Sequence, residues 1–226
     1  MQRFIAAAAG LAIAGAASAS FNLQVTEIYE GVPGDDITED WIEITNFGDM
    51  DYVFGVDGDL FFDDGSADPT VNERITGITS IGAGESVIVV ISNSSSDVSD
   101  FTAAWGAANL AGVQVGFLDG VDAPGLGQGG ESVYLFDSAA PGANIVDFTE
   151  YVGNDSGVPG RTWTWSGDAD LLSEQSVIGV NGAFLAPTAA GNAGEFQLIG
   201  SPGVIPAPGA AVLLGLAGLS AARRRR

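Results

Sequence analysis

Short runs of β-branched and aromatic residues, separated by turns rich in Gly, Asp, Asn and Pro, recur along most of this chain. The chain has 33 Gly and 9 Pro among its 226 residues. Such runs have the length of strands, and the turn residues interrupt helices, so the pattern predicts an all-β fold. The expected strands are residues 21–29, 41–45, 60–62, 74–78, 86–92, 113–118, 132–136 and 145–152.

Two of these runs predict which side chains face the core. In residues 41–45, Ile42 and Ile44 share one face, while Trp41, Glu43 and Thr45 share the other. Residues 87–91 are apolar at every position, which is typical of a strand covered on both faces.

One short helix is expected over residues 97–105. Ser94, Ser95 and Ser96 offer N-caps, and Val98, Phe101 and Trp105 form an apolar face before Gly106. Many short strands with a single short helix indicate a β-sandwich, here one domain over residues 20–203.

The N-terminal residues 1–19 predict a cleaved signal peptide. Arg3 precedes an apolar run over 4–15, and Ala17 and Ala19 give the small-x-small pattern that signal peptidase cuts, here before Ser20.

The C-terminal residues 204–226 predict a second sorting signal. Pro206 and Pro208 precede an uncharged apolar stretch over 209–222, and the chain closes on Arg223, Arg224, Arg225 and Arg226. As a helix, that stretch would rise about 21 Å, short of the roughly 30 Å hydrocarbon core. We therefore expect transient membrane association during export, with the arginines on the cytoplasmic side.

Between these ends the chain is strongly acidic. Of its seven Lys and Arg, only Arg74 and Arg161 fall within 20–203, against all 29 acids. Such a segment repels phosphates, so nucleic acid is excluded as a partner.

The absence of Cys, His and Lys restricts the chemistry further. Nucleophile systems built on Ser–His or Cys–His, the commonest zinc ligands and a lysine base are all excluded. Only carboxylate chemistry such as a glycosidase pair remains, and we expect no enzyme.

Calcium is the candidate cofactor, because hard oxygen ligands on turns suit it. Asp35, Asp36, Glu39 and Asp40 form one acidic cluster. The stronger candidate site is the second cluster, which follows no strict calcium motif and comprises Asp57, Asp59, Asp63, Asp64 and Asp68. A hydrated acidic surface is the alternative interpretation.

Two further patterns have both a binding and a structural interpretation. Trp163 and Trp165 share a strand face and are candidates for stacking on sugar rings, although such side chains more often fill a core. The glycine-rich residues 125–130 lead into an expected strand and lack Lys, so they predict a turn rather than a phosphate loop.

Residues 21–203 resemble the lamin tail domain, an immunoglobulin-like β-sandwich found in nuclear lamins and in exported bacterial proteins. The motifs that carry the resemblance are residues 25–28, 40–46, 63–65, 81–91, 130–135, 145–147 and 200–203, together with the helix that ends at Gly106.

The C-terminus resembles the PEP-CTERM sorting signal of bacteria, with Pro206-Ala207-Pro208 in place of Pro-Glu-Pro. This resemblance implies processing by an exosortase-like enzyme after signal peptidase.

Together these patterns predict an exported structural or adhesive module at the cell surface or in the extracellular matrix. Extracellular polysaccharide and surface proteins are the expected partners. A calcium-supported carbohydrate-binding module is the alternative, and a carboxylate-dependent hydrolase is a weaker one.

Overall fold

The protein is mostly β-structure with one short helix. The computed structural model describes residues 19–34, 36–120, 123–153, 157–167, 170–191 and 194–205. The longer strands are β1 (Leu23–Tyr29), β2 (Trp41–Asn46), β4 (Phe61–Asp64), β5 (Glu73–Thr76), β7 (Ser86–Val90), β8 (Val115–Asp119), β9 (Ser132–Phe136), β10 (Ile145–Tyr151), β14 (Phe184–Ala190) and β15 (Phe196–Gly200). The two-residue strands are β3 (Tyr52–Val53), β6 (Ser80–Ile81), β11 (Trp163–Thr164), β12 (Leu171–Leu172) and β13 (Glu174–Gln175).

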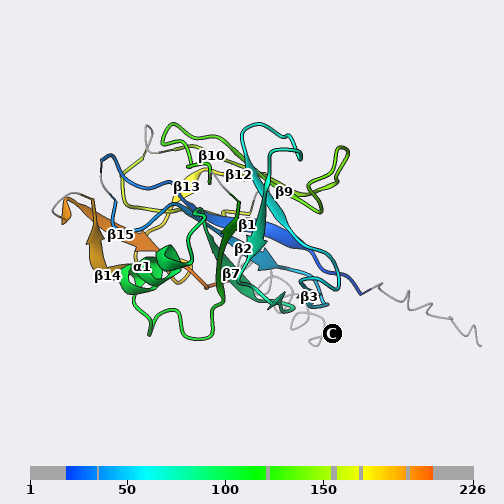
Figure 1. Ribbon diagram of the computed structural model, residues 1–226. Coiled ribbons are helices and arrows are strands. Elements are labelled where there is room, and N and C mark those ends of the chain that lie inside the picture. The colour runs from blue at the N-terminus through cyan, green and yellow to red at the C-terminus, as the bar shows by residue number, and fades with distance from the viewer. Residues whose placement is uncertain are drawn as a thin grey trace, which may run out of the picture.

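Most of these strands belong to one large mixed sheet. Its strand order is β12-β10-β9-β4-β5-β8-β7-β2-β1-β11-β13. The pairs β7–β8 and β10–β12 are parallel, and the other pairs in the sheet are antiparallel. The pairs β14–β15 and β3–β6 form two small separate sheets (Figure 1).

The large sheet turns back on itself, so that its two halves face each other. Although β1 and β10 stand far apart in the strand order, they lie in contact, and Val25 N–H donates to Asp147 Oδ2 across 2.7 Å. One apolar cluster fills the space between the halves and takes Val25 from β1, Ile44 from β2 and Leu135 from β9.

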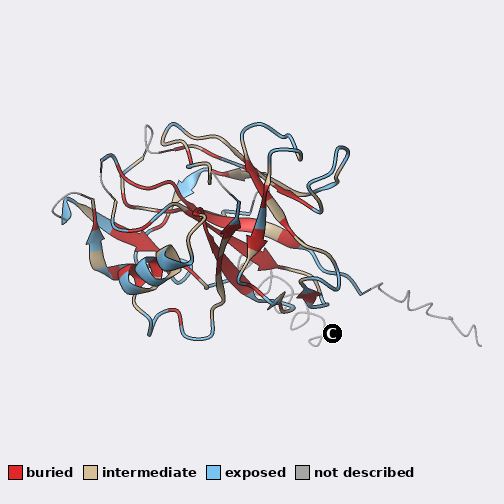
Figure 2. Cartoon of the chain, in the orientation of Figure 1, coloured by how far each residue is buried: buried red, intermediate tan, exposed pale blue. Residues whose placement is uncertain are grey.

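A second apolar layer lies on the other side of β1, β2 and β7. Ile88 and Val90 of β7 point into this layer, while Val87 and Val89 point into the first. Strand β7 is therefore buried on both faces, as its sequence predicts, and Figure 2 shows the buried centre of the sheet. The second layer is closed by the helix α1 (Ser95–Trp105) and by the β14–β15 hairpin.

Helix α1 begins at Ser95, two residues before the expected start, and ends at Trp105, as expected, with Gly106 as its C-cap. The Ser94 hydroxyl caps it by accepting the Ser96 N–H. Phe101 and Trp105 are fully buried, which confirms the expected apolar face.

Strands β14 and β15 are absent from the sequence-based expectation, as are the two-residue strands β3, β6, β12 and β13, whereas β11 falls where Trp163 and Trp165 are expected on a strand. Strand β14 reads Phe-Leu-Ala-Pro-Thr-Ala-Ala, with a proline and little alternation, and its pairing with β15 shifts register between Leu185 and Ala189. No helix in the described part of the chain is long and apolar enough to cross a membrane.

Candidate functional site

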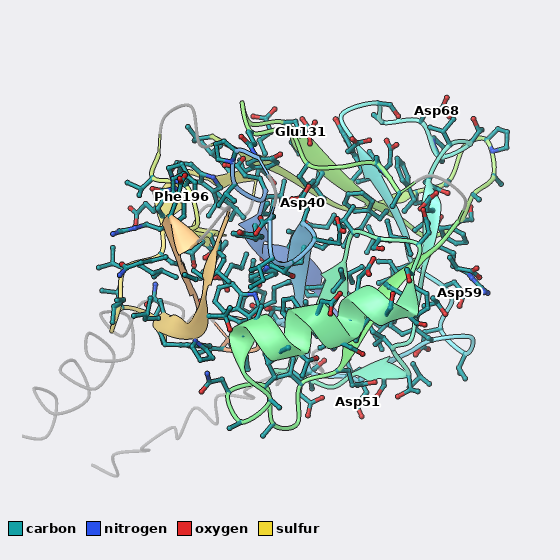
Figure 3. The ribbon with its side chains drawn as sticks, turned by 60° about the vertical axis from the view of Figure 1, so that its left-hand side comes forward. Asp40, Asp51, Asp59, Asp68, Glu131 and Phe196 are labelled. Carbon is teal, nitrogen blue, oxygen red and sulfur yellow. The ribbon has the colours of Figure 1, made fainter. Side chains whose placement is uncertain are left out.

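The five candidate calcium ligands lie on and around β4, and four of them make local contacts. Asp57 accepts the Val53 N–H at 2.8 Å, and Asp59 lies 3.6 Å from the Arg74 guanidinium. Asp63 is buried and accepts the Ser66 hydroxyl, and Asp68 accepts the N–H and hydroxyl of Thr70. Figure 3 shows Asp59 and Asp68 well apart.

Asp63 also accepts the Asp68 N–H at 3.2 Å, so these two residues share a turn, while Asp57 and Asp59 make contacts elsewhere. Asp64 is half-buried, and burial raises its pKa, with Glu131 and Asp63 adding to the effect. Among the described residues, no group of three or more carboxylates is placed to hold a metal ion.

The first acidic cluster contributes to a shallow surface cavity. Asp36 and Glu39 line it together with Asp97 and Asp100 of α1, around a volume of about 120 Å³. Burial raises the pKa of Glu39, and repulsion from Asp97, Asp36 and Asp100 raises it further. Asp35 lies outside the described residues.

Asp40 lies deeper and fixes the glycine-rich turn. Its Oδ2 accepts the Leu126 N–H at 2.6 Å, and Glu131 accepts the Gly127 N–H and, at 3.1 Å, the Tyr151 hydroxyl. Burial raises the pKa of Asp40 to about 7. Both backbone N–H groups are already bonded to carboxylates of the protein, so they are not available to bind a phosphate. Asp40 and Glu131 are labelled in Figure 3.

Sequence reasoning missed the most buried polar cluster, which surrounds Glu27 of β1 and Glu43 of β2. The two residues are paired in the β1–β2 register, next to the irregularity between Val25 and Glu27. They are 1% and 0% exposed, and neither forms an ion pair with Arg74 or Arg161 in the described structure.

Hydroxyl and backbone N–H groups surround both carboxyls instead. Glu27 Oε1 accepts the Thr162 hydroxyl and, at 2.8 Å, the Ser201 N–H, while its Oε2 accepts the Ser201 hydroxyl at 2.9 Å. Glu43 accepts the Thr26 hydroxyl at 2.8 Å and the Gly203 N–H at 2.6 Å. The pair therefore ties the C-terminal segment 201–203 to the first two strands.

Burial raises the pKa of both carboxyls above the ordinary range, that of Glu43 to about 8, with repulsion from Glu27 as its second cause. Because both groups are closed off from solvent, their hydrogen bonds hold strands together and reach no bound molecule. The signal in the sequence is the presence of Thr26, Thr45 and Ser86 in three of the expected strands. In the structure the Thr45 hydroxyl lies 2.7 Å from that of Thr26 and 2.7 Å from that of Ser86.

The two candidate sugar-stacking tryptophans are packed against the protein. Trp163 is 3% exposed, belongs to the first apolar cluster, and donates its Nε1–H to Glu30 at 3.0 Å. Trp165 is half-buried with its ring 5.5 Å from that of Phe47. This packing favours the core interpretation.

Most of the predicted sorting residues lie outside the described part of the chain, namely Ala17, Pro206, Pro208 and Arg223, Arg224, Arg225 and Arg226. Ala19 is described and exposed. Ser20, the predicted first residue after cleavage, donates its N–H to Asp49 Oδ1 at 2.7 Å.

Comparison with known proteins identifies no relative. No protein-family model, no curated protein and no solved structure matches the chain.

Proposed function

We propose that this protein is an exported structural or adhesive module, displayed at the cell surface or in the extracellular matrix after processing at both ends. Its body is proposed to be an immunoglobulin-like β-sandwich of the lamin-tail type. The contact between β1 and β10, with an apolar cluster between the two halves of the sheet, supports that architecture.

The observation that carries the proposal is where the two end segments attach. Asn22 N–H donates to Asn46 Oδ1, and Phe47 N–H donates to the Asn22 carbonyl, so the first residues after the predicted cut are fixed beside β2. Ser201 and Gly203 are fixed to Glu27 and Glu43. Cuts before Ser20 and near Pro208 would therefore leave the packed body whole.

The charge of the body agrees with an extracellular role. Its 29 acids far outnumber its two arginines, so most of the surface carboxylates stay hydrated, and its fold uses no disulfide because the chain has no Cys. The calcium-supported sugar-binding alternative has less support, since Trp163 is buried and no three carboxylates among the described residues are placed to hold a metal ion.

Cell fractionation tests the proposal. The native chain is expected in the outer or extracellular fraction. A variant with Ala17→Phe and Ala19→Phe is expected to remain uncleaved in the inner membrane, because signal peptidase needs small residues there. A Ser18→Thr variant, which changes the residue between them, is the matched control. Native chain found in the cytoplasm would contradict the proposal.

A further inference from the structure

The last part of the described chain differs sharply in charge from the rest. Of the 29 acids only Glu195 falls within residues 176–205, and no Lys or Arg does. The acids of the protein therefore fall almost entirely in the earlier part of the chain.

This charge-poor end also exposes aliphatic side chains. Val177, Ile178 and Val180 are 51%, 55% and 53% exposed on the connection between β13 and β14, and Val204 and Ile205 are 36% and 37% exposed. We call these five residues the aliphatic end. An exposed patch of large apolar residues is typical of a surface that meets another apolar body.

The five residues lie on two segments that run side by side. Val180 N–H donates to the Val177 carbonyl and Gly179 N–H to the Ala183 carbonyl, which folds residues 177–183 into a compact loop. A Cβ placed on Gly182 would stand 2.5 Å from Val204 Cγ1, so this loop touches the segment that holds Val204 and Ile205.

Both segments are attached to the buried Glu27 network. Ser176, directly before the loop, accepts the Thr162 hydroxyl at 2.8 Å, and Ser201 donates to both oxygens of Glu27. The aliphatic end is therefore presented from a fixed base.

The chain continues from this end into its most apolar stretch. Residues 209–222 carry no charge and begin four positions after Ile205, a reach of roughly 14 Å at most for an extended chain. The aliphatic end is thus the part of the body nearest to where that stretch would enter a membrane.

We propose that the aliphatic end docks on a lipid bilayer surface beside the entry point of residues 209–222. Docking here removes apolar side chains from water, and the segment 176–205 itself carries a single carboxylate, that of Glu195. Glu85, which lines the neighbouring cavity with Ile205, and Glu174, three residues before Val177, must stay hydrated at the edge of the contact. This inference deepens the proposed display function and rests on its membrane-associated stage.

Vesicle flotation of the full-length chain with phosphatidylcholine tests the docking. The double variant Ile178→Ser, Val180→Ser is expected to lower the partition coefficient roughly tenfold, because two aliphatic contacts with lipid are lost. The matched control is Val56→Ser, Val71→Ser, since these residues are 80% and 62% exposed in the acidic half; we expect less than a twofold change. Equal partitioning of both double variants would overturn the proposal.

Amide exchange on the unsubstituted chain gives a second readout that needs no variant. Vesicles are expected to slow exchange over residues 177–183 and to leave residues 53–58 unchanged. Uniform slowing of exchange along the chain would overturn the proposal. So would a loss of self-association in the Ile178→Ser, Val180→Ser variant without any change in flotation, which would assign the surface to a second copy of the chain. A negative result in the vesicle experiments would reject the docking surface alone, because cell fractionation tests export independently.

Discussion

At the scale of single residues, the buried pair Glu27 and Glu43 makes stability depend on pH. Both folded-state pKa values are raised by burial. A raised pKa means that the folded state holds a proton that the unfolded state releases. The contribution of Glu43 to stability is therefore complete below about pH 4.5 and is lost as pH rises through about 8, and Glu27 acts in the same direction. The burial of Asp40 and Asp147 raises their pKa values to about 7 and about 6 and acts in the same direction.

We therefore expect the free energy of unfolding to fall from pH 5 to pH 9, by about 1.4 kcal/mol per pH unit for each proton released. The melting temperature should fall with it. The Glu43→Gln variant keeps the shape of the side chain and cannot ionise, so its melting temperature should fall less over this range. Thermal melts followed by circular dichroism measure both curves.

The matched control is Glu174→Gln, on an exposed position of β13, which should leave the native pH dependence unchanged. Parallel curves for the native chain and the Glu43→Gln variant would show that this carboxyl keeps its charge in the folded state.

For Glu43, the sequence could predict only the face of the strand on which its side chain lies. Strand alternation groups it with Trp41 and Thr45, and that grouping alone does not distinguish a solvated face from a covered one. The face is covered because Ser201 and Gly203, some 160 residues later, close over it. A contact over such a separation leaves no periodic signal in the chain.

At the scale of elements, the turn after β2 is shaped by one glycine. A Cβ on Gly48 would stand 2.2 Å from the Ser20 carbonyl oxygen and 2.5 Å from Phe21 Cα. Backbone atoms cannot yield as a flexible side chain can, so the segment 20–22 would have to move.

We expect Gly48→Ala to lower the free energy of unfolding by about 1–3 kcal/mol, as overpacking does. Gly125→Ala is the control, because its Cβ would meet its nearest neighbour, Asp40 Oδ2, at an ordinary 3.6 Å. Urea unfolding of both variants measures the difference, and equal midpoints would mean that segment 20–22 is not held against Gly48.

Elements with strong local patterns could be predicted, and those defined by pairing could not. Strands β2, β7, β9 and β10 carry β-branched or aromatic runs, and α1 carries both a cap and an apolar face. Strand β14 instead contains Pro187 and four alanines or threonines, so only its pairing with β15 makes it a strand.

At the scale of the whole molecule, the fold separates three roles along the chain. The two apolar layers around β1, β2 and β7 provide the body, the loops around β4 carry much of the acid, and the charge-poor end leads towards the apolar C-terminal stretch. The sequence predicts the acidic excess and the two sorting ends, but not that the loop 177–183 meets the segment of Val204 and Ile205 in one exposed apolar patch.

The central claim is that the body between Ser20 and Ile205 is complete once both ends are removed. The most direct measurement is a thermal melt of the 20–205 fragment beside the full-length chain, in calcium and in chelator. We predict one cooperative transition with the same midpoint, within about 2 °C, in every case, because the contacts that fix Asn22, Ser201 and Gly203 all lie inside the fragment. A fragment that melts without cooperativity, or only folds with calcium, would contradict the account.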